Sequence, residues 1–476
     1  MFDLVIKTKK GLQWSAIERI LTQSAQLGIS LLLARLLGPA AFGLVGMLAV
    51  FIAIANVFVD SGFTSALIRK IDRSDNDYIT AFYYNIAMAG GAYVALYISS
   101  PYISDFYLQP ELQDLLRVLG ITVLINAFTL IPRVKLNVEM DFKTQAKISI
   151  ISILISGSIS IALALNEFGV WALVAQYGLN SICCMLLFNI FAPWLPSGRI
   201  TKQSFNYLFG FGSKILISSL LEVVYSNMYQ IIIGKKFNPS IVGQFTQANQ
   251  LASMPAMTLT SIIQRVTFPL FSQLQEHPDN MESAYRLTLK MAAIIIFPLI
   301  VGLGLIAQPL LTELLGTQWQ VAASLLSVLS FGFMLYPIHA TNLNLLQVLG
   351  RSDLFLKLEI FKKVIGVIIL LLSIPYGVLA MCIGLSITSY LSLFLNTYYT
   401  AKLTRISQWQ QCKDLIPIWL AVILSNALAY IAGMSWQAQP WLQISINISV
   451  VFLCYLLYLV LFERALLSQL RRVLQR

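Results

Sequence analysis

Charged residues are scarce in this sequence. Only 11% of its 476 residues are Asp, Glu, Lys or Arg, whereas 58% are hydrophobic and the mean hydropathy is +0.76. A soluble globular domain carries roughly 25% charged residues, so this shortage excludes a soluble protein. The sequence also lacks the alternating segments of about ten residues that a transmembrane β-barrel would show. It has instead a series of apolar runs of about 20 residues, the length with which a helix crosses a bilayer.

Residues that commonly catalyse reactions or bind metals are also few. The two His residues, His277 and His339, are far apart, and the five Cys residues show no CxxC spacing, so neither a metal site nor a disulfide framework is indicated. No Gly-rich phosphate loop is present, which argues against nucleotide hydrolysis. Asp75 and Asp77 have a DxD spacing, but a solvated charged turn explains them better. We therefore expect no enzyme activity, no metal and no cofactor.

The apolar runs predict an all-α, polytopic membrane protein. Each run is long enough for one crossing, and together they predict about fourteen transmembrane helices. The opening MFDLVIKTKK lacks the features of a cleavable signal, so we expect the first span to remain in the mature protein. The predicted spans are 14–36, 40–66, 79–99, 112–132, 146–166, 169–192, 207–233, 240–264, 290–311, 320–346, 355–374, 376–399, 415–433 and 441–462.

The net charge of +11 is explained by membrane topology. With these spans, 26 of the 32 Lys and Arg residues fall on the side of the membrane that holds both ends of the chain. In loops on the opposite side, only Lys235 and Lys236 are found. Cytoplasmic loops are enriched in cations, so both termini are predicted to be cytoplasmic and the number of spans to be even. Because the basic excess follows the topology, we expect no nucleic-acid partner.

Two short motifs recur at matching positions. RLLGPAAFG at 35–43 and KKFNPSIVG at 235–243 each place Pro four residues before Gly, and FGVWALV at 168–174 resembles YGVLAMC at 376–382. In the first motif Pro can begin a helix and Gly can permit a tight approach. The offsets of 200 and 208 residues predict two pseudo-symmetric six-helix lobes in the same orientation. The predicted parts are an N-lobe at 10–195, a C-lobe at 205–400, two extra transmembrane helices at 414–463 and an amphipathic cytoplasmic tail at 464–476.

Polar residues inside the spans concentrate at the start of each predicted lobe. A charge in hydrocarbon costs roughly 2.5–3.5 kcal/mol, so its presence indicates an aqueous path or a buried partner. In the first and seventh spans, polar residues recur every three or four positions, which puts them on one helix face. The second and eighth spans add further polar residues. The residues that we single out are Glu18, Arg19, Gln23, Gln26, Asp60, Lys214, Glu222, Ser226, Gln230 and Gln247.

Two interpretations of these polar faces remain open. The residues can line a wet cavity between the lobes, or they can pair in a packed bundle, for example Glu18 with Arg19 and Lys214 with Glu222. The cavity accounts better for two whole polar faces, because static packing needs only occasional small polar groups. We expect Arg19 to contact an anion, since a guanidinium can bind phosphate through two hydrogen bonds. Arg35 fits better as a side chain that reaches the outer head groups.

Two long segments of the chain carry a recognisable family pattern. WSAIERILTQSAQLGISLLLARLLGPAAFGLVGM at 14–47, followed by FVDSGFTSALIRK at 58–70, resembles the start of Wzx-type polysaccharide flippases of the O-antigen and colanic acid type. YQIIIGKKFNPSIVGQFTQANQLASMPAMTLTSIIQRVTFPLFSQLQ at 229–275 is similar to the matching segment of that family. The similarity covers about residues 10–400. The family belongs to the multidrug/oligosaccharidyl-lipid/polysaccharide exporter superfamily.

The resemblance implies two lobes around a central cavity that opens alternately to either side of the cell inner (cytoplasmic) membrane. The implied substrate is an oligosaccharide repeat unit on undecaprenyl pyrophosphate, used to build lipopolysaccharide or exopolysaccharide. Membrane lipids surround the protein, and polysaccharide polymerase or ligase machinery is a further possible partner. Arg19 and Lys214 then map to the contacts with pyrophosphate and acidic sugars.

The remaining polar residues divide into two predicted groups. One group lines the cavity as further substrate-binding residues, and the other is a candidate for coupling transport to a proton or another cation. The first consists of Gln23, Gln26, Ser226, Gln230 and Gln247, and the second of Glu18, Asp60 and Glu222. A multidrug-type extruder of small molecules and a membrane glycosyltransferase or polymerase remain as alternative functions. The carried glycan, the coupling ion and the oligomeric state stay open.

Overall fold

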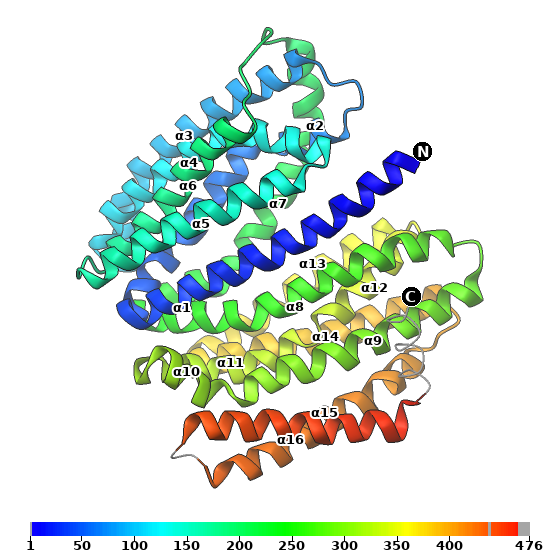
Figure 1. Cartoon of the computed structure of the whole chain (residues 1–476). Helices are drawn as coiled ribbons and strands as arrows, with labels where there is room; N and C mark the ends of the chain where they lie inside the picture. Colours follow the sequence, from blue (N-terminus) through cyan, green and yellow to red (C-terminus); the bar gives the residue numbers. More distant parts are fainter. Residues whose placement is uncertain (1, 437–438, 465–476) are drawn as a thin grey trace. The chain divides into compact units, whose positions relative to one another are not determined.

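The computed structural model describes residues 2–436 and 439–464, with side chains from Glu18 onward. Within these ranges the chain forms helices and the turns between them, and no strand is present. The predicted all-α class is therefore confirmed. The described part divides into two compact units, one ending at Thr246 and the other beginning at Gln247. Figure 1 labels the helices of both units.

The first unit contains seven helices and the start of an eighth. Among them, α3 packs on α4, α5 packs on α6, and α1 packs on α5 and α7. The helices are α1 (Phe2–Asp60), α2 (Phe63–Arg69), α3 (Asp75–Tyr107), α4 (Glu111–Glu139), α5 (Phe142–Leu165), α6 (Trp171–Phe191), α7 (Lys202–Lys236) and the first residues of α8 (Pro239–Gln273).

The second unit is built around α9, which contributes more residues to its central hydrophobic core than any other helix. α11, α12, α15 and α16 all contact α9. Besides the remainder of α8, its elements are α9 (Pro278–Leu305), α10 (Ala307–Leu315), η1 (Thr317–Trp319), α11 (Gln320–Phe333), α12 (Tyr336–Val348), α13 (Ser352–Ser373), η2 (Ile374–Tyr376), α14 (Val378–Leu403), α15 (Gln408–Met434) and α16 (Pro440–Phe462).

α1 is too long for a single crossing of a membrane. Its apolar part belongs to a helical stretch of 52 residues, Glu18–Arg69, which at 1.5 Å per residue would extend about 78 Å. The helix is interrupted at Gly38, whose backbone has φ 74° and ψ 175°, and Pro39 follows directly. A positive φ is easily adopted by glycine, and proline cannot continue the preceding helical hydrogen bonds. The interruption separates the predicted spans 14–36 and 40–66.

The repeated Pro and Gly motif forms a reciprocal backbone contact in the first unit. A Cβ atom added to Gly43 would lie 1.7 Å from Pro239 O, and one added to Gly243 would lie 1.9 Å from Pro39 O. Each glycine therefore leaves room for the carbonyl group of the other copy's proline. Pro239 is also the first residue of α8. The predicted helix start and tight approach are confirmed for this motif.

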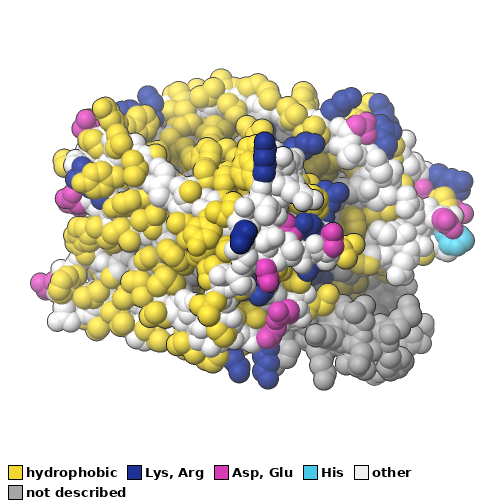
Figure 2. Space-filling model, turned by 90° about the horizontal axis from the view of Figure 1, so that it is seen from above, with side chains coloured by type: hydrophobic (Ala, Val, Ile, Leu, Met, Phe, Trp, Pro, Cys, Tyr) yellow, Lys and Arg dark blue, Asp and Glu magenta, His cyan; other side chains and the backbone are white. Residues whose placement is uncertain are grey.

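The described residues contain eleven helical stretches that are long and apolar enough to cross a membrane. α8 and α13 are not among them, because α8 is rich in Gln, Ser and Thr and the first half of α13 carries Lys357, Glu359, Lys362 and Lys363. Large apolar side chains lie on the surface, for example Phe452 and Leu453 of α16, which are 63% and 62% exposed. Figure 2 shows hydrophobic side chains over much of the face in view. Such a surface is suited to lipid.

The division into an N-lobe at 10–195 and a C-lobe at 205–400 stays a prediction. The first unit continues beyond the predicted N-lobe boundary at residue 195 to Thr246, and so includes α7, which packs on α1, α2 and α3. The last two helices, α15 and α16, pack on each other and on α9. Nearly all of the predicted amphipathic tail at 464–476 lies outside the described residues.

A polar cluster attaches α15 to the rest of the second unit. Tyr285 Oη of α9 lies 2.8 Å from Asn342 Oδ1 and 2.9 Å from Gln411 Oε1. The carboxylate of Asp414 accepts two hydrogen bonds from Arg286, at 2.7 and 2.9 Å, and a Lys290 Nζ lies 3.3 Å away. Because Asp414 is only 7% exposed, this ion pair replaces the water that the carboxylate loses. The first of the two extra helices, α15, is thus attached to α9 by side-chain hydrogen bonds and an ion pair.

The reciprocal glycine contact predicts a specific loss of stability. In Gly43→Ala or Gly243→Ala, the new methyl group would push against a backbone carbonyl, so each variant should lose roughly 2 kcal/mol of folding free energy. Gly28→Ala in the same α1 is the matched control, because no atom lies within 4 Å of its added Cβ. Thermal unfolding of the purified protein in detergent measures the difference. Equal melting temperatures for all three variants would show that the contact does not exist.

Candidate functional site

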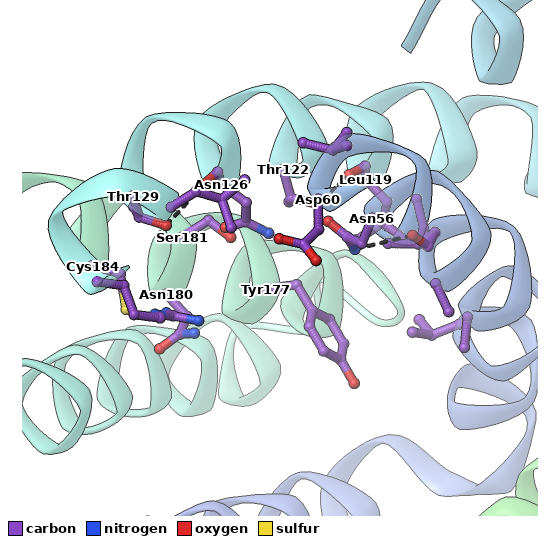
Figure 3. Close-up of a pocket in the computed structure, with 17 residues that line it drawn as sticks. Asn56, Asp60, Leu119, Thr122, Asn126, Thr129, Tyr177, Asn180, Ser181 and Cys184 are labelled. Carbon is purple, nitrogen blue, oxygen red and sulfur yellow. Dashed lines mark hydrogen bonds between the residues drawn. The ribbon is translucent and has the colours of Figure 1, made fainter. Parts of the chain in front are cut away.

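The first unit contains a cavity of about 600 Å³ between the second half of α1, α4 and α6. Figure 3 shows the side chains that line it. Apolar residues form much of the wall, and polar residues from all three helices interrupt it. The polar and sulfur-containing lining residues are Asn56, Asp60, Thr122, Asn126, Thr129, Arg133, Tyr177, Asn180, Ser181 and Cys184.

Helical spacing brings these side chains together. On α1, Asn56 and Asp60 are four residues apart, and on α4 the positions 122, 126, 129 and 133 advance by four, three and four. On α6, positions 177, 181 and 184 follow the same rule. Residues three or four apart share one helix face, so each helix presents one polar strip. Three strips that face one another make a polar cavity inside a unit with apolar surroundings.

Several lining residues have hydrogen bonds within their own helix. Asn56 Nδ2 donates to Ile52 O at 2.9 Å, and the Thr122 hydroxyl donates to Leu119 O at 2.6 Å. Asn180 differs, because its Oδ1 is buried without a hydrogen-bond partner among the described residues. A buried carbonyl oxygen without a partner costs about 1–3 kcal/mol. Water or a polar ligand in the cavity would supply the missing donor.

The cavity contains one carboxylate and one guanidinium. The Asp60 carboxylate accepts a hydrogen bond from the Thr64 hydroxyl, and Figure 3 shows it between the side chains of Asn126 and Asn56. The guanidinium carbon of Arg133 lies 5.5 Å from the centre of the Phe188 ring. Together with the amides and hydroxyls, these groups can bind water, a cation at Asp60 or a ligand rich in hydroxyl groups.

Two smaller hollows continue from this cavity to α7. The first, of about 190 Å³, shares Asn56 and Asp60 with the cavity and reaches Ser219 of α7. The second, of about 460 Å³, shares Ser219 and runs along the exposed face of α7 past Lys214 and Glu222. Because neighbouring hollows share residues, they form one polar row, which we call the Asp60 row. Asp60 lies where the cavity meets the small hollow that reaches α7.

The structure places the predicted α7 residues along one face. Lys214 and Glu222 line the same hollow of the Asp60 row. The Ser226 hydroxyl lies 2.6 Å from Glu222 O and 3.2 Å from Glu222 Oε1. Gln230 Nε2 donates to the Thr246 hydroxyl at 3.0 Å, within the first unit. The row therefore contains three of the predicted residues, Asp60, Lys214 and Glu222.

Four predicted residues at the start of α1 and Gln247 lie outside the three hollows of the row. Glu18, Arg19 and Gln23 are partly buried and Gln26 is exposed. Gln247 belongs to the second unit, is 0% exposed, and neither atom of its side-chain amide has a hydrogen-bond partner in the described residues. The substrate and coupling roles proposed for all of these residues stay predictions.

Sequence reasoning missed the contributions of α4 and α6. Asn126 and Asn180 each stand in a long apolar run, where a single polar residue suggests packing rather than a binding surface. The predicted topology puts Arg133 in a cytoplasmic loop after the span 112–132, whereas in the structure it lines the cavity. The available signal was the spacing of three and four residues between the polar positions of each run. None of these residues is close in sequence to Asp60, so their convergence became visible only in the fold.

The fold and the row define a helical membrane protein with a polar interior, and a solved structure of similar fold supports this class. The chain superimposes on the lipid II flippase MurJ, in an inward closed conformation, with a TM-score of 0.76 and 15% sequence identity, covering 95% of this chain and 99% of that one. At this identity the similarity shows the fold alone.

The sequence itself identifies the family. Residues 32–324 match the model of the family described as polysaccharide biosynthesis protein, and the chain belongs to that family. The teichuronic acid biosynthesis protein TuaB of Bacillus subtilis is 25% identical over 412 residues, which cover 85% of each chain. The lipopolysaccharide biosynthesis protein WzxC of Escherichia coli is 24% identical over 446 residues, covering 91% of this chain and 89% of that one. The resemblance noted from the sequence is confirmed.

Native cysteines allow a test of whether water enters the cavity. Cys184 lines the cavity, whereas Cys382 is 0% exposed in the second unit. In a protein that keeps only Cys184, a small charged methanethiosulfonate reagent should label the thiol, because thiolate forms only where water has access. A protein that keeps only Cys382 is the matched control and should remain unlabelled. Mass spectrometry measures both, and a Cys184 as inert as Cys382 would show that the cavity is dry.

Proposed function

We propose that this protein moves undecaprenyl-pyrophosphate-linked oligosaccharide repeat units from the inner to the outer leaflet of the cytoplasmic membrane by alternating access. The observation that carries the proposal is membership of the polysaccharide biosynthesis family over residues 32–324. The relatives TuaB and WzxC, which match most of the chain, are both named for the synthesis of a polysaccharide or lipopolysaccharide. The likeness of the fold to a lipid II flippase supports the same kind of cargo.

The physical need for such a protein follows from the chemistry of the substrate. A pyrophosphate with attached sugars carries charges and hydroxyl groups that would lose their water in hydrocarbon. A helical protein with polar groups inside the membrane can replace that water while the lipid tail stays in the bilayer. The Asp60 row, with Lys214 and Glu222 on the α7 face, supports this role because it keeps charged and amide groups within candidate spans.

The proposed topology has fourteen spans and two six-helix lobes followed by two further helices. Dividing Glu18–Arg69 at Gly38 into two crossings, and adding α8 and α13, brings the eleven candidate stretches to fourteen. An even number places both termini on one side, and the distribution of Lys and Arg supports the cytoplasmic side of the inner membrane.

The proposed residue roles follow from charge and hydrogen-bonding capacity. Arg19 and Lys214 contact the pyrophosphate, because both are cations on polar helix faces within the membrane. The amides and hydroxyl predicted earlier contact the sugars, and the acidic residues couple transport to a cation. The sugar contacts are Gln23, Gln26, Ser226, Gln230 and Gln247, and the coupling residues are Glu18, Asp60 and Glu222. The polymerase or ligase that uses the product is a proposed partner.

A deletion strain tests this function against its alternatives. Without the protein, the complete lipid-linked repeat unit should accumulate on the inner leaflet and surface polysaccharide should fall. Mass spectrometry of extracted lipids identifies the accumulated glycolipid, a membrane-impermeant glycosidase shows in which leaflet it lies, and an immunoblot measures surface polysaccharide. An incomplete glycan would point to a glycosyltransferase. Single lipid-linked repeat units that accumulate on the outer leaflet would point to a polymerase. Unchanged glycolipids together with drug sensitivity would point to a multidrug-type extruder.

The same strain tests Arg19. Complementation with Arg19→Ala should restore less than a tenth of the wild-type surface polysaccharide, since a lost contact between a guanidinium and phosphate costs about 1.5–3 kcal/mol. Arg35→Ala, on the same helix and exposed, is the matched control and should complement fully. Membrane levels of both variants are compared by immunoblot. Full complementation by Arg19→Ala removes Arg19 from the substrate site.

A further inference from the structure

The second unit contains a polar cluster that the Asp60 row does not use. Its centre is His339 of α12, which is partly exposed and lies within the candidate span Thr317–Val348. Its Nε2 is 3.0 Å from the hydroxyl of Ser389, and its Nδ1 is 3.2 Å from the amide nitrogen of Asn396. Ser389 and Asn396 both belong to α14. An imidazole is the side chain whose charge changes most readily near neutral pH, so the proton positions in this cluster matter.

The hydrogen bonds determine which ring nitrogen carries the proton. The Ser389 hydroxyl donates its single hydrogen to Gly332 O at 2.8 Å. It can therefore only accept from His339, which requires a hydrogen on Nε2. Nδ1 is then left with its lone pair, and it accepts from the Asn396 Nδ2 group. In this conformation His339 is thus a neutral imidazole with Nδ1 as its basic atom.

Asn396 can serve the protonated ring as well as the neutral one. It is 0% exposed, and its Oδ1 has no hydrogen-bond partner among the described residues. If a proton from water binds to Nδ1, a half turn of the Asn396 amide brings Oδ1 to accept from the new Nδ1–H group. The half turn also gives the buried oxygen its missing partner. Ser389 keeps the same role in both states, so each ring nitrogen has a hydrogen-bond partner with either charge.

The helices around this site carry both charged and neutral groups. Lys362 of α13 forms an ion pair with Glu359 of the same helix. α14 faces the ring with the neutral Ser389 and Asn396, and on α9 the cations Arg286 and Lys290 are bound to Asp414. A movement of α13 that brings Lys362 closer to His339, or takes it farther away, would change proton binding at the ring because like charges repel.

We propose that His339 is a proton-binding site of the second unit, that it takes its proton at Nδ1, and that this proton is bound and released during transport. Its existence follows from the His339, Ser389 and Asn396 contacts alone. Its use in transport rests on the proposed flippase function. Coupling requires a site whose proton affinity differs between two conformations. A change in the distance between Lys362 of α13 and His339 would supply such a difference.

Nuclear magnetic resonance of the full-length protein tests the site directly. The chain has only two His residues, and His277 lies exposed before α9. With ¹⁵N-labelled histidine in lipid nanodiscs, the His277→Gln protein reports His339 alone. We expect the Nε2–H tautomer near neutral pH and a growing imidazolium signal on acidification. The Nδ1–H tautomer, or a ring that never gains a proton while the protein stays folded, would overturn the proposal.

Asn396→Asp is the second variant. It should increase the protonated fraction of His339, which a loss of folding at the site would not explain. A carboxylate beside Nδ1 would hold the imidazolium, so the ratio of charged to neutral ring should rise at least tenfold at a fixed pH. An unchanged ratio in a folded variant would show that Asn396 does not face the basic nitrogen. This spectroscopic result does not depend on any transport activity.

Complementation of the deletion strain tests the use of the proton. His339→Gln should lower surface polysaccharide at least tenfold at wild-type membrane levels, whereas His277→Gln should leave it unchanged. If wild-type protein fails to move the glycolipid while the spectra behave as expected, the proposed function is wrong and the proton site stands. If transport occurs and His339→Gln supports it fully, the role of the proton in transport is wrong.

Discussion

A polar group inside a membrane needs a partner, and this constraint organises the structure at every level. Backbone groups meet it through helices, which is why the described chain has no strand. Single Thr and Asn side chains meet it by bonding to the preceding turn, as Thr122 does to Leu119 and Asn342 does to Ile338. Where the helix must break, Gly38 and Pro39 confine the break to two residues.

The two units satisfy this constraint in different ways. In the second unit, Tyr285 binds Asn342 and Gln411, Arg286 binds Asp414, and these pairs attach α15 to the bundle. In the first unit, the strips on α1, α4 and α6 face a cavity instead, and Asn180 retains a buried oxygen without a protein partner. Paired polar groups hold helices together, whereas polar groups that face a cavity are available to water and ligands. The difference explains why most of the proposed substrate and cation contacts belong to the first unit.

The sequence predicted the features that depend on local chemistry. Apolar runs gave the helices, and the repeated motif gave the tight approach that Gly43 and Gly243 now explain. The spacing on α7 correctly put Lys214 and Glu222 on one face. The contributions of α4 and α6 were missed because isolated polar residues such as Asn126 look like packing in an apolar run. His339 looked isolated for a related reason, since Ser389 and Asn396 are 50 and 57 positions away in the chain.

Transport of the glycolipid by the purified protein is the measurement that bears most directly on the proposed function. Lipid-linked repeat units extracted from the deletion strain are placed in the inner leaflet of proteoliposomes, and a membrane-impermeant glycosidase is added outside. We expect the protein to make the sugars accessible to the enzyme much faster than in vesicles without protein. Equal rates in both kinds of vesicle, with the protein folded and correctly inserted, would show that it is not a flippase for this substrate.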